Sequence, residues 1–356
     1  MRPFSFDAQP ARVVFGFGTL SQIPAEAERL GLKRVLVLAT PQQAADAEAL
    51  AARLGARSAG TYSKAAMHTP VTVTEEAMRV VEDRGVDGVV AVGGGSTTGL
   101  AKAIALRTDL PQIVAPTTYA GSEMTPILGE TRNGLKTTQR SPKVLPEVVI
   151  YDVDLTLTLP AALSATSGMN AIAHAVEALY AQDRNPVISL LSAEGIKALA
   201  RALPAIVAAP DDRDARSDAL YGAWLCGMAL GSVGMALHHK LCHTLGGTFD
   251  LPHAETHTAV LPHALAFNAP AAPEAARAVA DALGVNDPAR GLYDLARRLG
   301  ARTALKDLGM PEDGIDKAAD LAMANPYWNP RPLERGALRD LLARAYAGEA
   351  PAEVRP

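Results

Sequence analysis

Four of the chain's eight histidines lie in the short segment His238–His253, which reads HHKLCHTLGGTFDLPH. His239 and His243 are four residues apart, so on a helix they share a face. His253 follows a Gly-Gly pair and a Leu-Pro step, and we expect it in a loop that turns back toward the other two. Imidazole binds transition metals and also serves as an acid or base near neutral pH. The segment therefore predicts either a metal site or an acid–base site.

A second segment, SGMNAIAHAVEAL, offers a matching polar pair. Asn170 and His174 are also four residues apart and share a helical face. Any one of these histidines is equally well explained as a core residue, but buried imidazoles need partners and rarely cluster without a role. The combined pattern favours one site built from two helices. Its candidate catalytic residues are Asn170, His174, His239, His243 and His253.

A glycine-rich segment, VVAVGGGSTTGLAKAIAL, predicts a phosphate-binding loop between a strand and a helix. Glycine lets the backbone approach a ligand closely, and the first turn of a helix offers unpaired N–H groups. A tight strand-to-helix turn without a ligand is the alternative reading. A later loop, PTTYAGSEMTP, adds hydroxyl groups for the same dinucleotide. The candidate cofactor-binding residues are Thr40, Gly93, Gly94, Gly95, Ser96, Thr97, Thr117, Thr118 and Ser122.

The residues after the first expected strand bear on the choice between NADH and NADPH. An acidic residue at that place binds the adenosine ribose and repels a 2′-phosphate. The chain has Ala39-Thr40-Pro41 there, so the sequence admits either dinucleotide.

Strand and helix patterns alternate through the first part of the chain. The sequence predicts strands in the segments 34–40, 56–63, 86–96, 112–118 and 147–160, with helices in 41–55, 72–85 and 96–108. Such alternation implies a parallel sheet covered on both faces. Beyond Pro160 the periodicity is almost entirely helical, in segments 160–182, 189–209, 218–246 and 273–284.

The predicted fold class is therefore an α/β dinucleotide-binding domain, residues 1–159, followed by an α-helical domain, residues 160–356. Folds of this kind collect ligands near the carboxyl ends of their strands, so we expect the active site in a cleft between the two domains.

The bulk composition excludes several classes of protein. A net charge of −4 gives no reason to expect a nucleic-acid partner. The N-terminal residues lack a signal-peptide pattern, and no uncharged apolar run reaches the length of a membrane span. Cys226 and Cys242 are too few for a disulfide framework. We expect a cytoplasmic enzyme without a membrane partner.

These motifs together resemble the iron-containing alcohol dehydrogenase family, which has a dehydroquinate-synthase-like fold. The resemblance rests on the GGGS loop, on PTTYAGSEMT and GMNAIAHAVEAL, and on the H-x3-H-x9-H spacing, and it covers nearly the whole chain. Within the family, GGGSTTGLAKAIAL, VLPEVVIYD and NPYWNPRPLERGALRDLL are most similar to the maleylacetate reductases. The resemblance implies NADH- or NADPH-dependent reduction of maleylacetate to 3-oxoadipate in the breakdown of aromatic compounds. It also implies a homodimer.

Two departures from the family pattern concern the metal. The resemblance places Asn170, His174, His239 and His253 at the metal-binding positions, with His243 as a nearby active-site histidine. Asn170 stands where metal-dependent members have Asp, and an amide leaves the charge of a divalent ion uncompensated. Gly99 stands where alcohol dehydrogenases of the family often have Asp. We therefore expect that no metal is required and that His243 supplies the proton.

A dicarboxylate substrate would need cations, and the chain offers Lys136, Arg140 and Arg331 in segments that resemble the reductases. Solvated surface charge explains each of them equally well, and we retain Lys136 and Arg140 as candidate substrate contacts. Three other functions remain open: a metal-dependent alcohol or aldehyde dehydrogenase, a dehydroquinate-synthase-like lyase, and a nucleotide-binding protein without activity.

Overall fold

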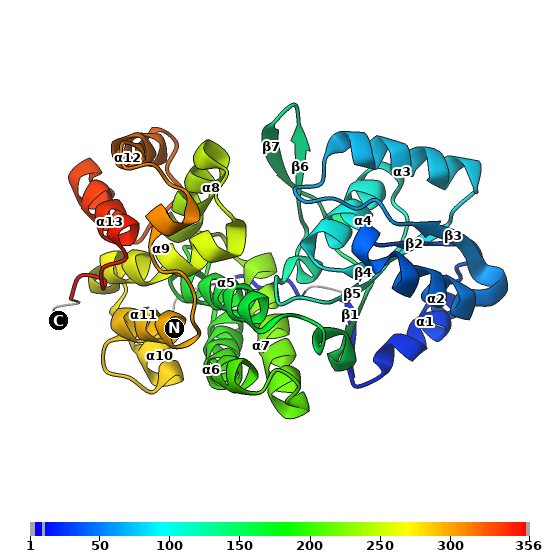
Figure 1. Cartoon of the computed structure of the whole chain (residues 1–356), viewed down its shortest axis with the longest axis horizontal. Coiled ribbons are helices and arrows are strands. Elements are labelled where there is room, and N and C mark those ends of the chain that lie inside the picture. Colours follow the sequence, from blue (N-terminus) through cyan, green and yellow to red (C-terminus); the bar gives the residue numbers. More distant parts are fainter. Residues whose placement is uncertain (1–3, 9–10, 354–356) are drawn as a thin grey trace. The chain divides into compact units, whose positions relative to one another are not determined.

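The computed structural model describes residues 4–8 and 11–353, without the side chains of residues 135 and 136. The chain divides into two compact units (Figure 1). An α/β unit comprises Ala8–Leu159, and a helical unit comprises Pro160–Pro356 together with the segment Met1–Asp7. Of the described residues, 4–7 thus group with the helical unit, and the domain bounds 1–159 and 160–356 remain a prediction.

The α/β unit is built on a six-stranded parallel sheet with the strand order β1-β8-β5-β4-β2-β3. Its strands are β1 (Arg12–Gly16), β2 (Val35–Leu38), β3 (Ser58–Tyr62), β4 (Gly88–Gly93), β5 (Gln112–Pro116) and β8 (Val148–Asp152). The four inner strands are buried along their whole length, which is why they appear in the sequence as continuous apolar runs.

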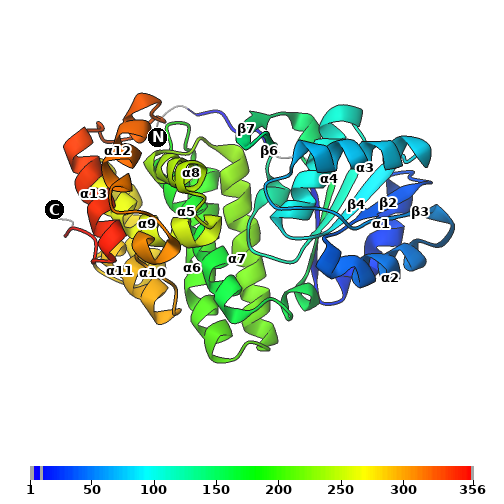
Figure 2. The ribbon, with the colours of Figure 1, turned by 45° about the horizontal axis from the view of Figure 1, so that its top comes forward.

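Helices cover both faces of this sheet (Figure 2). Helices α1 (Ile23–Arg29) and α2 (Ala44–Leu54) pack on one face, and α3 (Val71–Asp83) and α4 (Gly95–Thr108) pack on the other. A separate hairpin, β6 (Ile127–Arg132) and β7 (Leu135–Arg140), turns at Asn133-Gly134, where both residues have positive φ. Asn-Gly is the pair that such a tight turn favours.

The helical unit contains nine α-helices in its described residues. They are α5 (Ala161–Tyr180), α6 (Pro186–Ala208), α7 (Arg213–Ser232), α8 (Leu237–Phe249), α9 (His253–Asn268), α10 (Pro273–Leu283), α11 (Pro288–Arg298), α12 (Gly314–Ala324) and α13 (Arg335–Ala347). The two-part fold class predicted from the sequence is confirmed.

The long helical segment expected over 218–246 is broken in the structure. Helices α7 and α8 meet at an angle of 93° around the residues 233–236. In the described part of the chain no single helix is long and apolar enough to cross a membrane; only this bent pair meets the length and composition criteria together.

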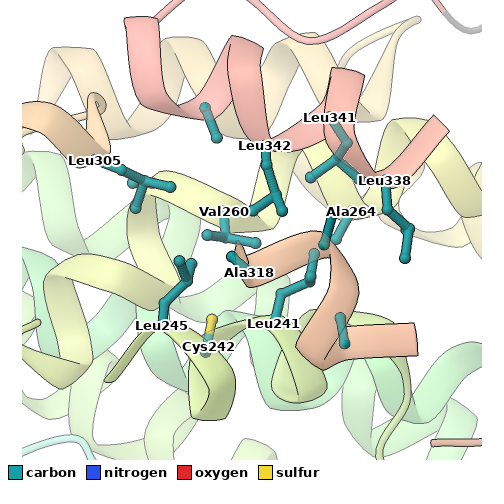
Figure 3. Close-up of a cluster of buried hydrophobic side chains, with 14 of the residues drawn as sticks. Leu241, Cys242, Leu245, Val260, Ala264, Leu305, Ala318, Leu338, Leu341 and Leu342 are labelled. Carbon is teal, nitrogen blue, oxygen red and sulfur yellow. The ribbon is translucent and has the colours of Figure 1, made fainter. Parts of the chain in front are cut away.

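Helix α8 has two chemically different faces. One face packs Leu241, Cys242 and Leu245 into an apolar cluster formed with α9, α12 and α13 (Figure 3). Burial raises the pKa of Cys242, so its thiol stays protonated in this cluster. Cys242 is therefore a core residue, and the histidines of α8 lie on the rest of the helix surface.

Helix α9 contains a buried titratable group outside the histidine cluster. His263 is 3% exposed, both of its ring nitrogens lack hydrogen-bond partners among the described residues, and burial lowers its pKa to about 4. Unfolding restores a pKa near 6.5, so below that pH protons bind the unfolded chain first. The free energy of unfolding should therefore fall by about 3 kcal/mol on account of His263 as the pH drops from 6.5 toward 4, and this part of the stability should be fully present above pH 6.5.

The measurement is the free energy of urea unfolding between pH 7 and pH 4, compared with that of His263→Leu. The leucine variant should unfold with a flatter pH dependence, because it removes one group that is protonated only after unfolding. Parallel curves for the two proteins would contradict the burial of a neutral imidazole at this position.

Candidate functional site

The predicted phosphate loop lies between β4 and α4. Gly94 is the residue before the helix, and the N–H groups of Thr97 and Thr98 both donate to its carbonyl at 3.1 Å. The backbone of Gly93 has φ +154°, and a Cβ there would lie 2.4 Å from Oγ1 of Thr97. At Gly95 a Cβ would meet nothing within 4 Å, so this side of the loop is open. The geometry suits a bound pyrophosphate.

Other predicted cofactor residues surround the same loop. The N–H of Thr117 donates to the Gly93 carbonyl at 3.1 Å, and Thr118 lies 3.1 Å from where a Cβ on Gly94 would be. Thr40 donates to Gln43, whose side chain also borders Gly93. Thr97 Oγ1 is buried without a hydrogen-bond partner among the described residues. The structure therefore brings the predicted residues of three loops together.

The second loop is held by a buried lysine that the sequence did not single out. Lys102 is fully buried in α4, and burial lowers its pKa to about 7. Its ammonium donates to the carbonyls of Ser122, Thr125 and Ile127 at 2.5–2.9 Å. Ser122 thus lies beside the second turn of α4. A lysine among the small and apolar residues of a buried helix could have pointed to this contact, because a buried ammonium group needs hydrogen-bond acceptors nearby.

Gly99 has a physical explanation in this structure. A Cβ at Gly99 would lie 2.2 Å from Oγ1 of Thr69, a residue whose φ is +48°. The Thr69 carbonyl accepts a hydrogen bond from the N–H of Thr131, which fixes the loop in this position. An aspartate at residue 99 would therefore require a different conformation of the loop that contains Thr69.

Arg140 does not lie near the phosphate loop. With Arg12 and Arg29 it lines a cavity of about 690 Å³ beside Glu147, the residue before β8. Arg12 begins β1, so this cavity lies at the amino ends of the parallel strands, whereas the phosphate loop follows the carboxyl end of β4. The side chain of Lys136 lies outside the described residues. Both remain predictions as substrate contacts.

The histidine cluster is built from three helices of the helical unit. The rings of His174 on α5 and His239 on α8 have centroids 5.2 Å apart, and His243 lies 5.9 Å from His239. His253 is the first residue of α9, not part of a loop as expected, and its ring lies 4.3 Å from that of His257 one turn later. His257 in turn lies 4.9 Å from His239. The four predicted histidines therefore form one connected group.

Exposure divides this group into two parts. His243 and His253 are exposed, whereas His174, His239 and His257 are buried. Burial lowers the pKa of His174 and His257 well below the usual value, and the neighbouring histidines lower it further. These two rings are neutral at pH 7. A proton exchanged with solvent or substrate is more readily supplied by the exposed part of the cluster.

Four polar atoms on the buried side lack hydrogen-bond partners among the described residues. They are Oδ1 of Asn170, Nδ1 of His174, Nε2 of His239 and Nε2 of His257. Buried polar atoms are usually paired, so these four atoms indicate a place for a ligand or water.

Glu177, which the sequence analysis missed, organises the start of α8. Its carboxylate is fully buried and accepts hydrogen bonds from the N–H groups of Ala236 and His238 at 3.0 and 2.7 Å. It also lies 2.6 Å from Nδ1 of His239. A carboxylate at a helix N-terminus satisfies unpaired N–H groups and interacts favourably with the helix dipole. Glu177 therefore stabilises the break between α7 and α8 and fixes the orientation of the His239 ring.

Two further buried histidines lie behind the predicted set. Nε2 of His238 lies 3.0 Å from Nδ1 of His257, and Cys242 Sγ lies 3.7 Å from the same His238 nitrogen. The sequence contained a signal for Glu177 and for His257. Glu177 follows His174 by three residues in an apolar helix, and His257 follows His253 by four, so each shares a helical face with a predicted residue.

Sequence comparison identifies the family to which this architecture belongs. The N-terminal model of iron-containing alcohol dehydrogenases matches residues 10–153, and the C-terminal model matches residues 164–346. The chain belongs to the iron-containing alcohol dehydrogenase family. The predicted family is thereby confirmed.

Several relatives that match this chain along its whole length are named maleylacetate reductase. Maleylacetate reductase from Rhizobium sp. (strain MTP-10005) is 58% identical over 99% of this chain and 100% of its own. The crystal structure of maleylacetate reductase from Agrobacterium tumefaciens has 60% identity and a TM-score of 0.97, covering 99% of this chain and 100% of that chain. An iron-containing alcohol dehydrogenase from Corynebacterium glutamicum has 45% identity and a TM-score of 0.95 over the full length of both chains.

Proposed function

We propose that this dehydrogenase reduces maleylacetate to 3-oxoadipate with NADH or NADPH, in the breakdown of aromatic compounds. The observation that carries the proposal is the identity of 58–60% to maleylacetate reductases along the whole chain. The open phosphate loop would bind the dinucleotide that supplies the hydride, and the histidine cluster would supply the proton.

The α/β unit would hold the dinucleotide. The N–H groups at the start of α4 would bind the pyrophosphate, and the open space at Gly95 leaves room for its oxygens. When bound, the reduced nicotinamide supplies the hydride that adds to the carbon–carbon double bond of the substrate. The hydroxyl groups of Thr97 and Thr118 would donate hydrogen bonds to the phosphates or ribose.

The helical unit would supply the proton. Hydride addition leaves an electron pair delocalised over the substrate enolate, and a proton must then reach the adjacent carbon. His243, which is exposed, would donate that proton in its imidazolium form and become neutral imidazole. His174, His239 and His253 would line the substrate site, with hydrogen bonds from imidazole stabilising the enolate oxygen.

The family positions do not suit a divalent metal ion in this chain. Asn170, His174, His239 and His253 form an uncharged donor set, so the charge of the ion would be uncompensated. The histidines whose ring atoms converge within 4.8 Å are instead His238, His239 and His257. Of these, His239 is held at Nδ1 by Glu177 with Nε2 left unpartnered among the described residues, and His238 lies against His257. We therefore propose that the reaction needs no metal.

The variant Asn170→Asp tests this part of the proposal. It restores the carboxylate of metal-dependent members and should raise the affinity for Zn²⁺ or Fe²⁺, measured by calorimetry on the purified protein. It should also lower maleylacetate reduction in the absence of metal, because a carboxylate would repel a dianionic substrate. The isosteric variant Asn170→Leu, which adds no charge, serves as the control. Equal metal affinity in the parent and Asn170→Asp would show that residue 170 does not face the histidines.

The substrate is tested by following dinucleotide oxidation with maleylacetate and, in parallel, with simple aldehydes. We expect kcat/KM for maleylacetate to exceed that for aldehydes by several orders of magnitude. A preference for aldehydes would instead favour an alcohol or aldehyde dehydrogenase. If the chain binds the dinucleotide but oxidises it with neither maleylacetate nor aldehydes, a nucleotide-binding protein without activity would be favoured. The homodimer expected from the family remains a prediction.

A further inference from the structure

Lys102 fixes the loop between β5 and β6, which comprises residues 117–126. The lysine lies two turns into α4, and its side chain is fully buried. Its ammonium donates to the carbonyls of Ser122 and Thr125, to Oγ1 of Thr125 and to the carbonyl of Ile127, the first residue of β6, at 2.5–2.9 Å. One buried cation therefore joins three residues of this region to the helix that begins at the phosphate loop.

The same loop is anchored at two other places in the α/β unit. The carboxylate of Glu123 is buried and accepts a hydrogen bond from the hydroxyl of Tyr151 on β8 at 2.8 Å. At the start of the loop, the N–H of Thr117 donates to the carbonyl of Gly93 at 3.1 Å. The loop is thus held by α4, by the sheet and by the phosphate loop together.

The order of the strands indicates which part of a dinucleotide this loop would meet. Strands β2, β4 and β5 are consecutive neighbours in the parallel sheet, so their carboxyl ends lie at one edge. The pyrophosphate is proposed at the turn from β4 to α4, and the adenosine ribose beside the residues that follow β2. A dinucleotide that extends across this edge has its nicotinamide half beside the loop that follows β5.

We propose that Lys102 is a positioning residue for dinucleotide binding, holding residues 117–126 in the conformation that receives the nicotinamide half. The inference rests on the proposed function, because it takes a dinucleotide as the ligand. Lys102 acts through the loop, since its ammonium is surrounded by oxygens of residues 122–127. A loop that is fixed before binding loses less conformational entropy when the ligand binds, and the affinity is higher for that reason.

The first test needs no variant and no ligand. The N–H groups of Met124 and Thr125 donate within the loop, to the carbonyls of Gly121 and Ser122 at 3.1 and 3.2 Å. In the unaltered protein without cofactor, these two amides should exchange with deuterium at least about 100-fold more slowly than in an unstructured peptide. Exchange at the rate of an unstructured peptide would show that the loop is not fixed in advance, and would overturn the inference.

The second test compares two ligands of different length at pH 6.5, below the pKa of about 7 for Lys102. Lys102→Met keeps the length of the side chain but donates no hydrogen bond. It should raise the Kd for NADH by about 10–100-fold and the Kd for ADP, which lacks the nicotinamide half, by less than about 3-fold. Lys33→Met, at an exposed lysine before β2, is the matched control and should leave both Kd values unchanged.

A second substitution covers a methionine variant that does not fold. Lys102→Gln keeps two N–H hydrogens for the loop carbonyls, so it should raise the Kd for NADH less than Lys102→Met and again spare ADP. In either variant, the Met124 and Thr125 amides should exchange faster than in the unaltered protein, whereas those of β4 should not. Unchanged exchange of the two loop amides would overturn the role of Lys102.

The binding results separate this inference from the proposed function. Equal increases in Kd for NADH and ADP would mean that the nucleotide site as a whole is damaged, and would overturn the assignment of the loop to the nicotinamide half. Failure of the unaltered protein to bind either NADH or NADPH would instead contradict the proposed function. Hydrogen exchange would still decide whether Lys102 fixes the loop, so the two failures are distinguishable.

Discussion

Replacing His243 by alanine is expected to lower kcat for maleylacetate by about 10²–10⁴-fold, the usual cost of losing a general acid. His243 is exposed, and the Tyr327 hydroxyl lies 3.0 Å from Nδ1 of its ring. The affinity for NADH should change little, because the phosphate loop lies in the other unit of the chain. The measurement is steady-state kinetics together with a dinucleotide titration of the same preparation.

Added imidazole provides the control for this variant. Because His243 is exposed, free imidazole should reach the vacated position and restore part of the lost turnover. The thermal unfolding temperature should stay close to that of the unaltered protein, since removing an exposed side chain leaves no buried cavity. A lower unfolding temperature with unchanged turnover per folded molecule would mean that His243 is structural.

Replacing Gly94 by aspartate is expected to raise the Kd for NADH by at least about 100-fold, which corresponds to about 3 kcal/mol. The Cβ would press against Thr118 at 3.1 Å, and the carboxylate would stand at the helix start where the pyrophosphate is expected. Calorimetric titration with NADH measures the effect, and circular dichroism shows whether the variant is folded.

Gly94→Ala separates bulk from charge in this experiment. It adds the same Cβ without a carboxylate, and Thr118 needs to move by only a few tenths of an ångström to accommodate it. We expect Gly94→Ala to raise the Kd for NADH much less than Gly94→Asp does. Only the increase caused by the aspartate should become smaller as the salt concentration rises. Unchanged NADH affinity in Gly94→Asp would remove this loop from the cofactor site.

Local patterns in the sequence were sufficient to predict much of the fold. The inner strands are buried on both faces, so they appear as unbroken apolar runs, and β2, β4, β5 and β8 were all predicted. Strand β1 was not predicted; it lies at the edge of the sheet, and its residues are only partly buried. The hairpin of β6 and β7 was also missed, although Asn133-Gly134 is a strong turn signal.

The break between α7 and α8 could not be predicted from periodicity, since its cause is distant in the sequence. The N–H groups at the start of α8 are paired with Glu177, which lies about sixty residues earlier. The predicted histidines lie close together because helical spacing is a local property. Glu177 on α5 and Tyr327 contact His239 and His243 on α8 across large separations in the sequence, and contacts of that kind depend on how the helices pack.

We propose that this histidine cluster supports reduction of maleylacetate without a metal. A single-turnover experiment tests it most directly: enzyme, NADH and one equivalent of maleylacetate are mixed, and the metal content of the same sample is measured by mass spectrometry. We predict that the full equivalent is converted to 3-oxoadipate at one rate, whether the sample holds almost no metal or has been supplemented with Fe²⁺ or Zn²⁺. An amount of product that rises in proportion to bound metal would contradict the claim.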